Sequence, residues 1–138
     1  MADTETSLAR RAIPRRPPVI LVVDDDESIR ELMLAALETM GATVVLAEDG
    51  EEGLRVARSV RPDLAIIDLE MPRLDGARLI SLLRAESAFA HLPILLCTAH
   101  PRFVRLVGVP VLPKPFRLGA LLDTVQELVP VASSAAEG

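Results

Sequence analysis

The sequence predicts an α/β domain in which a five-stranded parallel sheet carries helices on both faces, the doubly wound arrangement. Short apolar runs rich in Val, Leu and Ile recur five times, and such runs are typical of strands buried on both faces. The segments between them space apolar residues three and four apart, as amphipathic helices do. Because strands and helices alternate, right-handed crossovers place the helices on both faces of one parallel sheet.

The first half of the chain begins with the helix that has the clearest signals. Its apolar stripe consists of Ile29, Leu32, Met33, Ala36, Leu37 and Met40. Asp26 or Glu27 can cap the start of this helix, and Gly41 ends it. The other predicted elements of this half are the strand VILVV from Val19, the strand TVVLA from Thr43 and a helix over residues 50–59.

The second half repeats the alternation. Its predicted elements are the strand LAII from Leu64, a helix over residues 76–86, the strand PILLC from Pro93 and the strand VPVL from Val109. A last helix carries the apolar stripe Leu118, Leu121, Leu122, Val125, Leu128 and Val129, and Pro130 ends it.

The length of the chain, 138 residues, suits one domain with a core and is too short for two ordinary ones. Half of the residues are apolar and 2% are aromatic, so the core must consist of aliphatic side chains. We expect a folded domain at residues 18–130. A disordered, basic and Pro-rich tail is expected at residues 1–17, and a flexible tail at residues 131–138.

Charge and hydropathy exclude two classes of partner. The net charge is −5, and residues 1–17 contribute +2 of it, so the remainder carries −7 and is unsuited to nucleic acid. No apolar run approaches the roughly 20 residues that span a bilayer, and we therefore expect a cytoplasmic protein without a membrane partner. Cys97 is the only cysteine, which excludes an internal disulfide and indicates a buried structural thiol.

Polar residues stand where the predicted strands end. These residues are Asp24, Asp25 and Asp26 after the first strand, Asp68 after the third, Thr98 after the fourth, and Lys114, the chain's only lysine, after the fifth. Ligands of such sheets bind at the carboxyl ends of the strands. Each residue alone has a simpler explanation as a loop, a helix cap or a solvated side chain, but a chance gathering of all of them at one edge is improbable.

The chemistry of this set indicates a metal-dependent phosphoryl site. Clustered carboxylates repel one another unless a cation joins them, so Asp24, Asp25 and Asp68 call for a hard divalent ion. Mg²⁺ prefers oxygen ligands, and the absence of His and Cys from the set argues against zinc. A carboxylate beside Mg²⁺ can accept a phosphoryl group. The Lys114 ammonium and the Thr98 hydroxyl suit the phosphoryl oxygens, because a compact point charge fits a small pocket where a planar guanidinium would not.

Four motifs in this order and spacing resemble the receiver domain of bacterial two-component response regulators: ILVVDDDESIRELM, LAIIDLEMPRLDG, ILLCTA and LPKPF. The resemblance covers about residues 19–129. It implies a receiver-like, flavodoxin-like sheet of strand order 2-1-3-4-5. It also implies that Asp68 is the phosphoacceptor, Asp25 a direct Mg²⁺ ligand, Asp24 a ligand through water, and the Glu70 backbone carbonyl a further ligand.

The resemblance assigns the remaining site residues too. Thr98 would bind the phosphoryl group as the switch hydroxyl, Lys114 would pair with it, and the Lys114–Pro115 peptide bond would be cis. The chain departs from the family at Val111, where relatives usually carry Tyr or Phe. The segment between Thr98 and Lys114 is also short and contains Pro101 and Gly108, so the family's fourth helix is expected to be cut to one or two turns.

Two residues are expected to flank the mouth of the site, Glu70 and His100, and both can tune the lifetime of the phosphate. Neither His91 nor His100 has a partner that indicates metal or catalytic work, so both are expected to be surface residues.

We therefore expect a single-domain response regulator rather than an enzyme, apart from self-catalysed phosphotransfer and dephosphorylation. A histidine kinase or a histidine phosphotransfer protein would phosphorylate Asp68, and a monomeric regulator would act through another protein. One alternative is a receiver used only for protein contact. The other is a haloacid-dehalogenase-like phosphatase with Asp24 as nucleophile, because Asp24, Asp26 and Ser28 imitate the Asp-x-Asp-x-Thr loop of that family.

Overall fold

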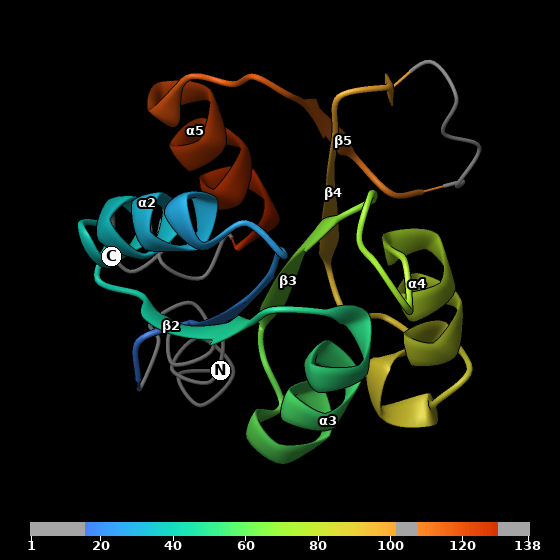
Figure 1. Ribbon diagram of the computed structural model, residues 1–138. Coiled ribbons are helices and arrows are strands. Elements are labelled where there is room, and N and C mark those ends of the chain that lie inside the picture. Colours follow the sequence, from blue (N-terminus) through green and yellow to red (C-terminus); the bar gives the residue numbers. More distant parts are fainter. Residues whose placement is uncertain (1–15, 102–107, 130–138) are drawn as a thin grey trace, which may run out of the picture.

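The computed structural model of the chain describes residues 16–101 and 108–129, and these form one five-stranded parallel sheet flanked by helices (Figure 1). The strand order is β2-β1-β3-β4-β5, as the resemblance to receiver domains implies. The strands are β1 (Val19–Val23), β2 (Thr43–Ala47), β3 (Leu64–Asp68), β4 (Ile94–Thr98) and β5 (Val111–Pro113). The helices are α2 (Glu27–Glu38), α3 (Gly50–Val60), α4 (Gly76–Arg84), α5 (Leu118–Leu128) and the short 3-10 helix η1 (Ser87–Phe89).

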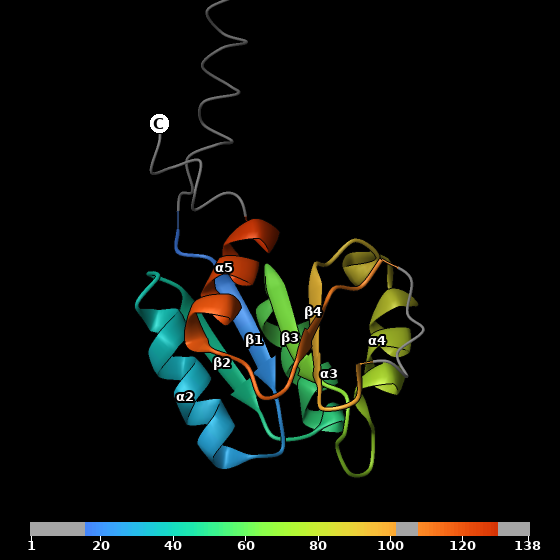
Figure 2. The same cartoon turned by 90° about the horizontal axis from the view of Figure 1, so that it is seen from above.

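The helices cover the two faces of the sheet in pairs. Helices α2 and α5 lie on one face, and α3 and α4 lie on the other (Figures 1 and 2). Successive side chains of a strand point to opposite faces. Ile20 and Val22 of β1 therefore join the core under α2 and α5, whereas Leu21 and Val23 join the core under α3 and α4. This two-sided burial explains why the strands are continuous apolar runs.

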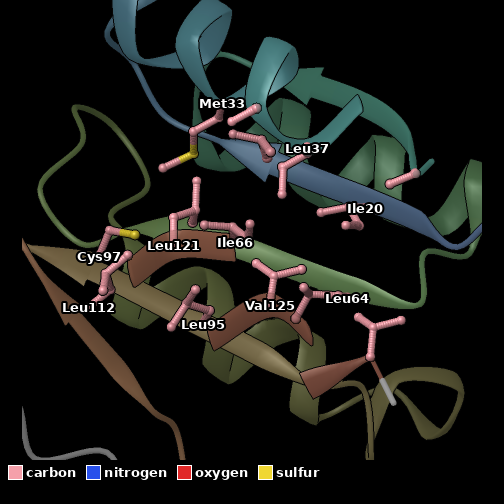
Figure 3. Packing of buried hydrophobic residues seen from close by; sticks show 14 residues of the cluster. Ile20, Met33, Leu37, Leu64, Ile66, Leu95, Cys97, Leu112, Leu121 and Val125 are labelled. Carbon is pink, nitrogen blue, oxygen red and sulfur yellow. The ribbon is translucent and has the colours of Figure 1, made fainter. Parts of the chain in front are cut away.

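The core under α2 and α5 is built from interlocking aliphatic side chains (Figure 3). Met33 and Leu37 of α2 and Leu121 of α5 are each at most 1% exposed. They pack with the residues that the strands direct to this face, which are Ile20, Val22, Leu64, Ile66, Leu95, Cys97 and Leu112. Burial of a Leu or Ile side chain stabilises the fold by roughly 1.5–3 kcal/mol, so this core holds α2 and α5 on the sheet.

The helices that follow β1, β2 and β3 begin at the carboxyl edge of the sheet, and an aspartate caps each of them. Asp26 accepts hydrogen bonds from the backbone N–H groups of Ser28 and Ile29 at the start of α2. Asp49 and Asp75 cap α3 and α4 in the same way. Each cap satisfies a backbone donor that the helix itself leaves unpaired. Asp26, one of the acids singled out in the sequence, is thus committed to a helix start.

The observed bounds differ from the predicted ones at a few ends. Strands β4 and β5 begin after Pro93 and Pro110, because a proline has no N–H to donate to the sheet, although both carbonyls still accept. Helix α4 ends at Arg84 instead of residue 86. Helix α2 ends at Glu38, and Gly41 turns the chain with a φ of 83°. The shortened helix predicted between Thr98 and Lys114 falls largely outside the described residues, as do the two predicted tails.

Candidate functional site

The predicted site residues lie together at the carboxyl edge of the sheet. Asp24 directly follows β1, Asp68 is the last residue of β3, Thr98 is the last residue of β4, and Lys114 directly follows β5. Asp24, Asp68 and Thr98 are each at most 3% exposed. Since burial of a polar group costs free energy unless it is paired, the partners of these side chains decide what the site can do.

Three carboxylates form a group able to hold a metal ion. One oxygen each from Asp24, Asp25 and Asp68 lies within 4.8 Å of the others, and Asp25 is exposed while the other two are buried. An all-oxygen donor set with one side open to solvent fits Mg²⁺, which keeps water or phosphate oxygens among its ligands. Asp26 does not belong to this group.

Lys114 lies between the two buried carboxylates. Its Nζ atom lies 3.0 Å from Asp68 Oδ1 and 3.3 Å from Asp24 Oδ2, and its backbone N–H donates to the Thr98 carbonyl at 2.8 Å. The Lys114–Pro115 peptide bond is cis, as the resemblance implied. Burial alone would lower the pKa of Lys114. The hydrogen bond to Asp68 and the charge of Asp24 outweigh that effect, so the pKa is raised and the group stays an ammonium.

The surroundings of Asp68 raise its pKa above the ordinary value of an aspartate. Burial raises its pKa to about 6, and the neighbouring charges of Asp24 and Glu70 add to the rise, although the hydrogen bond from Lys114 opposes it. The group is therefore mostly ionised at neutral pH but poorly solvated. A carboxylate in this condition is a plausible nucleophile and a strong attractor of cations.

Thr98 and Glu70 are hydrogen-bonded across the mouth of the site. The Thr98 hydroxyl donates to Glu70 Oε2 and accepts the backbone N–H of His100 at 2.9 Å. The His100 Nδ1 atom lies 3.6 Å from the same carboxylate. His100 is exposed and lies beside Glu70 at the mouth of the site, as predicted. The turn after Thr98 folds back onto the threonine, whereas the bond between Thr98 and Glu70 joins residues 28 positions apart and left no signal in the sequence.

The connection from β3 to α4 holds Glu70 against this group. The backbone N–H of Gly76 donates to the Leu69 carbonyl at 3.0 Å and closes the connection into a loop. A Cβ atom on Gly76 would lie 2.4 Å from the Asp68 carbonyl oxygen, so only glycine permits this approach. We call residues 69–75 the β3–α4 loop.

Sequence reasoning missed one ion pair that anchors the β3–α4 loop. Arg73 Nη1 lies 2.6 Å from Asp49 Oδ2, the carboxylate that caps α3. The spacing of Asp49 and Glu52 marks a helix start in the sequence, but nothing there indicates that Arg73 would reach it.

Two further sequence interpretations concern residues beside the site. Cys97 is buried, and burial raises the pKa of its thiol to about 12, which agrees with a structural role. Val111, where the resemblance to receiver domains implies Tyr or Phe, is half-buried in β5 and packs toward α3 and α4. Within residues 16–101 and 108–129, no helix combines the length and the apolar character needed to cross a membrane.

Comparison with known families identifies the domain to which this geometry corresponds. Residues 20–126 match the model of the response regulator receiver domain. Among curated proteins, response regulator MprA of Mycolicibacterium vanbaalenii is 42% identical over 119 residues, which cover 82% of this chain and 51% of that protein. MprA of Mycobacterium ulcerans is 43% identical over 80% of this chain and 49% of its own length. The chain thus spans about half the length of these relatives.

Solved structures give the same result. Chemotaxis protein CheY4 of Vibrio cholerae superposes with a TM-score of 0.75 at 33% identity, covering 81% of this chain and 98% of that structure. The receiver domain of the sensor histidine kinase PA1611 of Pseudomonas aeruginosa superposes with a TM-score of 0.76 at 28% identity, covering 83% and 98%. That structure is described as having a magnesium ion coordinated in its active-site cleft.

Proposed function

The chain belongs to the response regulator receiver domain family, and from this premise we propose that its Asp68 accepts a phosphoryl group from a histidine kinase or a histidine phosphotransfer protein in a Mg²⁺-dependent phosphorelay. The observation that carries the proposal is the contact of the only lysine with two buried carboxylates at the carboxyl edge of the sheet. Receiver domains of response regulators serve phosphorylation-based two-component signalling, so the family and this geometry agree.

The reaction follows from the surroundings of Asp68. An ionised oxygen of Asp68 attacks the phosphorus atom, the phosphorus–nitrogen bond to the donor histidine breaks, and an acyl phosphate forms. Lys114 holds the carboxylate at 3.0 Å and is placed to pair with the incoming phosphoryl oxygens. The Thr98 hydroxyl would bind another of these oxygens once it leaves Glu70.

The three clustered carboxylates of Asp24, Asp25 and Asp68 explain the proposed dependence on a metal. Asp25 would bind Mg²⁺ directly, Asp24 through water, and Asp68 and the Glu70 backbone carbonyl would complete the protein's share of ligands. When bound, the ion would offset the negative charge of the carboxylates and the phosphoryl group. The relative from Pseudomonas aeruginosa with magnesium in its cleft supports this assignment.

The two alternative functions make different use of the same residues. A phosphatase of the haloacid-dehalogenase type would use Asp24 as nucleophile and Asp26 as its acid, but Asp26 is engaged as the cap of α2. A receiver that serves only for contact would bind its partner whether or not Asp68 is phosphorylated. The complete set of polar residues around Asp68 favours a working phosphoacceptor.

We propose that the output passes to another protein while the receiver itself stays monomeric. Val111 has no ring that could rotate inward, so the usual coupling to the pairing face is weakened. Phosphorylation should instead perturb the backbone amides of the site and of residues 98–107. Residues 102–107 of that segment lie outside the described residues. Amide chemical shifts and light scattering test this, and strong phosphorylation-driven dimerisation through β5 and α5 would contradict it.

The deciding experiment locates the phosphoryl group. The protein is incubated with acetyl phosphate with or without Mg²⁺, reduced with borohydride and analysed by mass spectrometry. We expect modification of Asp68 only with Mg²⁺, and none in Asp68→Asn. Asp75→Asn is the matched control, because it changes an acid that only caps α4 and asparagine caps equally well. Equal labelling in excess EDTA, full labelling of Asp68→Asn, or modification of Asp24 would refute the assignment.

A further inference from the structure

The Asp49 carboxylate joins two parts of the molecule that are distant in sequence. Its Oδ1 atom accepts the backbone N–H of Glu52 at 2.8 Å and so caps α3, while its Oδ2 atom accepts from Arg73 Nη1 at 2.6 Å. The Asp49 side chain is 11% exposed, and each of its oxygens accepts a hydrogen bond from the protein. One buried carboxylate therefore ties the start of α3 to the β3–α4 loop.

The backbone of Arg73 indicates that this tie has a cost. Its φ angle is 63°, in the left-handed region that glycine adopts freely and a side chain with a Cβ does not. A glycine at this position would be the relaxed choice for the turn. The arginine instead accepts an unfavourable backbone and gains the contact with Asp49.

The loop is also packed closely on the start of α3. A Cβ atom on Gly50 would lie 2.3 Å from the Leu74 carbonyl oxygen, so Leu74 lies directly over the first turn of the helix. Gly76 at the other end of the loop lies against the Asp68 backbone in the same way. The loop that carries Glu70 is thus held at Gly76 and at Leu74, and Arg73 adds a third attachment.

We propose that Asp49 and Arg73 are positioning residues for the metal and phosphoryl site: they hold the β3–α4 loop in the conformation in which the Glu70 carbonyl serves the metal. This inference rests on the proposed function, because it concerns the ligand that the function assigns to Glu70. Neither residue touches the reacting atoms. Their effect is to keep the loop ordered before the ion arrives, so that binding does not have to order it.

A purely stabilising role does not explain the pair well. The Arg73 side chain is 64% exposed, and ion pairs of that kind contribute about 0–1 kcal/mol to folding. Arg58 and Glu86 form a comparable pair at 2.6 Å with Arg58 57% exposed, and it joins α3 to the end of the α4 segment away from the acidic group. That pair provides a control for the arginine, because it matches the contact distance and the exposure of the cation without bearing on the loop, although its carboxylate is 30% exposed against 11% for Asp49.

The test measures Mg²⁺ affinity and loop order separately from global stability. In the full chain, Mg²⁺ is titrated by calorimetry, amide hydrogen exchange of residues 69–76 is followed without metal, and urea unfolding gives the stability. Arg73→Gly removes the ion pair and suits the φ of 63°. We expect Mg²⁺ affinity to fall roughly tenfold, the lower end of what supporting residues contribute, with faster exchange in the loop and unchanged or higher global stability.

Further variants separate the ion pair from other effects. Arg73→Lys should retain most of the affinity, because the observed contact uses a single guanidinium nitrogen. Asp49→Ser keeps a capping side chain for α3 but loses the pair, so it should reproduce Arg73→Gly, and the double variant should lose no more than either single one. Arg58→Gln should leave Mg²⁺ affinity unchanged.

The outcomes distinguish this inference from the proposed function. If the wild-type protein binds Mg²⁺ and is phosphorylated on Asp68, yet Arg73→Gly matches it in affinity and loop exchange, the positioning role is wrong and the proposed function stands. An equal loss of affinity in Arg58→Gln would also overturn the positioning role, since the effect would then be general. A wild-type protein that does not bind Mg²⁺ would overturn both.

Discussion

Two cations hold carboxylates at the same edge of the sheet, and they do so in different surroundings. Lys114 is 22% exposed and contacts two carboxylates that are almost completely buried. Arg73 is 64% exposed and contacts one carboxylate that also caps a helix. The first cation lies at the centre of the proposed chemistry, whereas the second lies at the rim and acts on a loop.

The space and the solvent around a cation explain why lysine suits one position and arginine the other. At the centre, a compact ammonium can contact both Asp24 and Asp68 within a small buried space, and a planar guanidinium would need more room. At the rim, the long guanidinium reaches from one loop to another and remains solvated. Loss of the Lys114 ammonium would leave two buried carboxylates without a cation, which costs about 3–5 kcal/mol, against about 0–1 kcal/mol for a partner lost from an exposed pair.

Replacement of Lys114 by arginine should give the largest combined effect on stability and on signalling. We expect Lys114→Arg to lower the free energy of unfolding by about 1–3 kcal/mol, because the larger group overfills the buried space. It should also abolish the change in amide chemical shifts on phosphorylation, although the charge is kept. Urea unfolding and NMR spectra measure the two effects.

Arg73→Lys is the matched control for that exchange and should be nearly neutral in both measurements. If Lys114→Arg instead responded to phosphorylation as the wild type does, Lys114 would matter only as a positive charge, and the contrast between centre and rim would disappear.

Removing the carboxylate charge of Asp68, beside Lys114, and that of Asp49, beside Arg73, should change the free energy of unfolding in opposite directions. Without Mg²⁺ at pH 7, Asp68→Asn should raise the free energy of unfolding by about 2–3 kcal/mol, because burial raises the pKa of Asp68 from 3.8 to about 6 even with Lys114 beside it, and a pKa shift of one unit corresponds to about 1.4 kcal/mol. Asp49→Asn should lower the stability slightly, since it keeps the cap but loses the ion pair with Arg73.

The pH dependence of the free energy of unfolding provides a second test of whether ionised Asp68 destabilises the fold. The folded-state pKa of about 6 lies above the ordinary value of 3.8, so the folded protein binds this proton more tightly than the unfolded chain. The resulting stabilisation is complete below about pH 4 and is lost as the pH rises through about 6. The difference between Asp68→Asn and wild type should therefore grow over this window. A difference that does not vary with pH would contradict the burial of Asp68 as its cause.

Mg²⁺ and the proton should compete for the Asp68 carboxylate, whereas the ion pair of Arg73 with Asp49 should not affect this competition. Because the metal needs the ionised carboxylate of Asp68, the apparent Mg²⁺ affinity should fall by up to about tenfold for each pH unit below about 6. Calorimetric titrations between pH 5 and 7.5 test this expectation. Arg73→Gly should shift the whole affinity curve downward without moving its midpoint in pH, and a moved midpoint would mean that the rim pair changes the titration of Asp68.

The smallest effect is expected from Glu70→Gln. The charge of Glu70 is the weakest of the causes that act on the pKa of Asp68, so its removal should lower that pKa only slightly. Glutamine still offers an oxygen to the Thr98 hydroxyl, and the fold should be unaffected. NMR titration of the Asp68 carboxyl carbon gives the shift. A shift as large as that caused by Asp24→Asn would place Glu70 at the centre of the charge group and not at its mouth.

The order of residues along the chain is enough to predict the sheet and the polar residues at its edge. Strands buried on both faces must be apolar along their whole length, and alternation with amphipathic helices permits few topologies, so the doubly wound fold was predictable. The residues that end the strands meet at one edge in any such sheet. For that reason Asp24, Asp68, Thr98 and Lys114 could be placed together before the structure was available.

The contacts among these polar side chains, and the shifts in their pKa values, could not be predicted from the sequence, because they depend on the folded structure. The bonds of Glu70 to Thr98 and of Arg73 to Asp49 join residues 28 and 24 positions apart, through loops whose paths depend on packing. The raised pKa of Asp68 likewise comes mainly from burial, which no local pattern encodes. Hydrophobic periodicity is a local property that the chain carries in its order of residues, whereas the contacts and solvation of polar side chains exist only after distant segments have packed together.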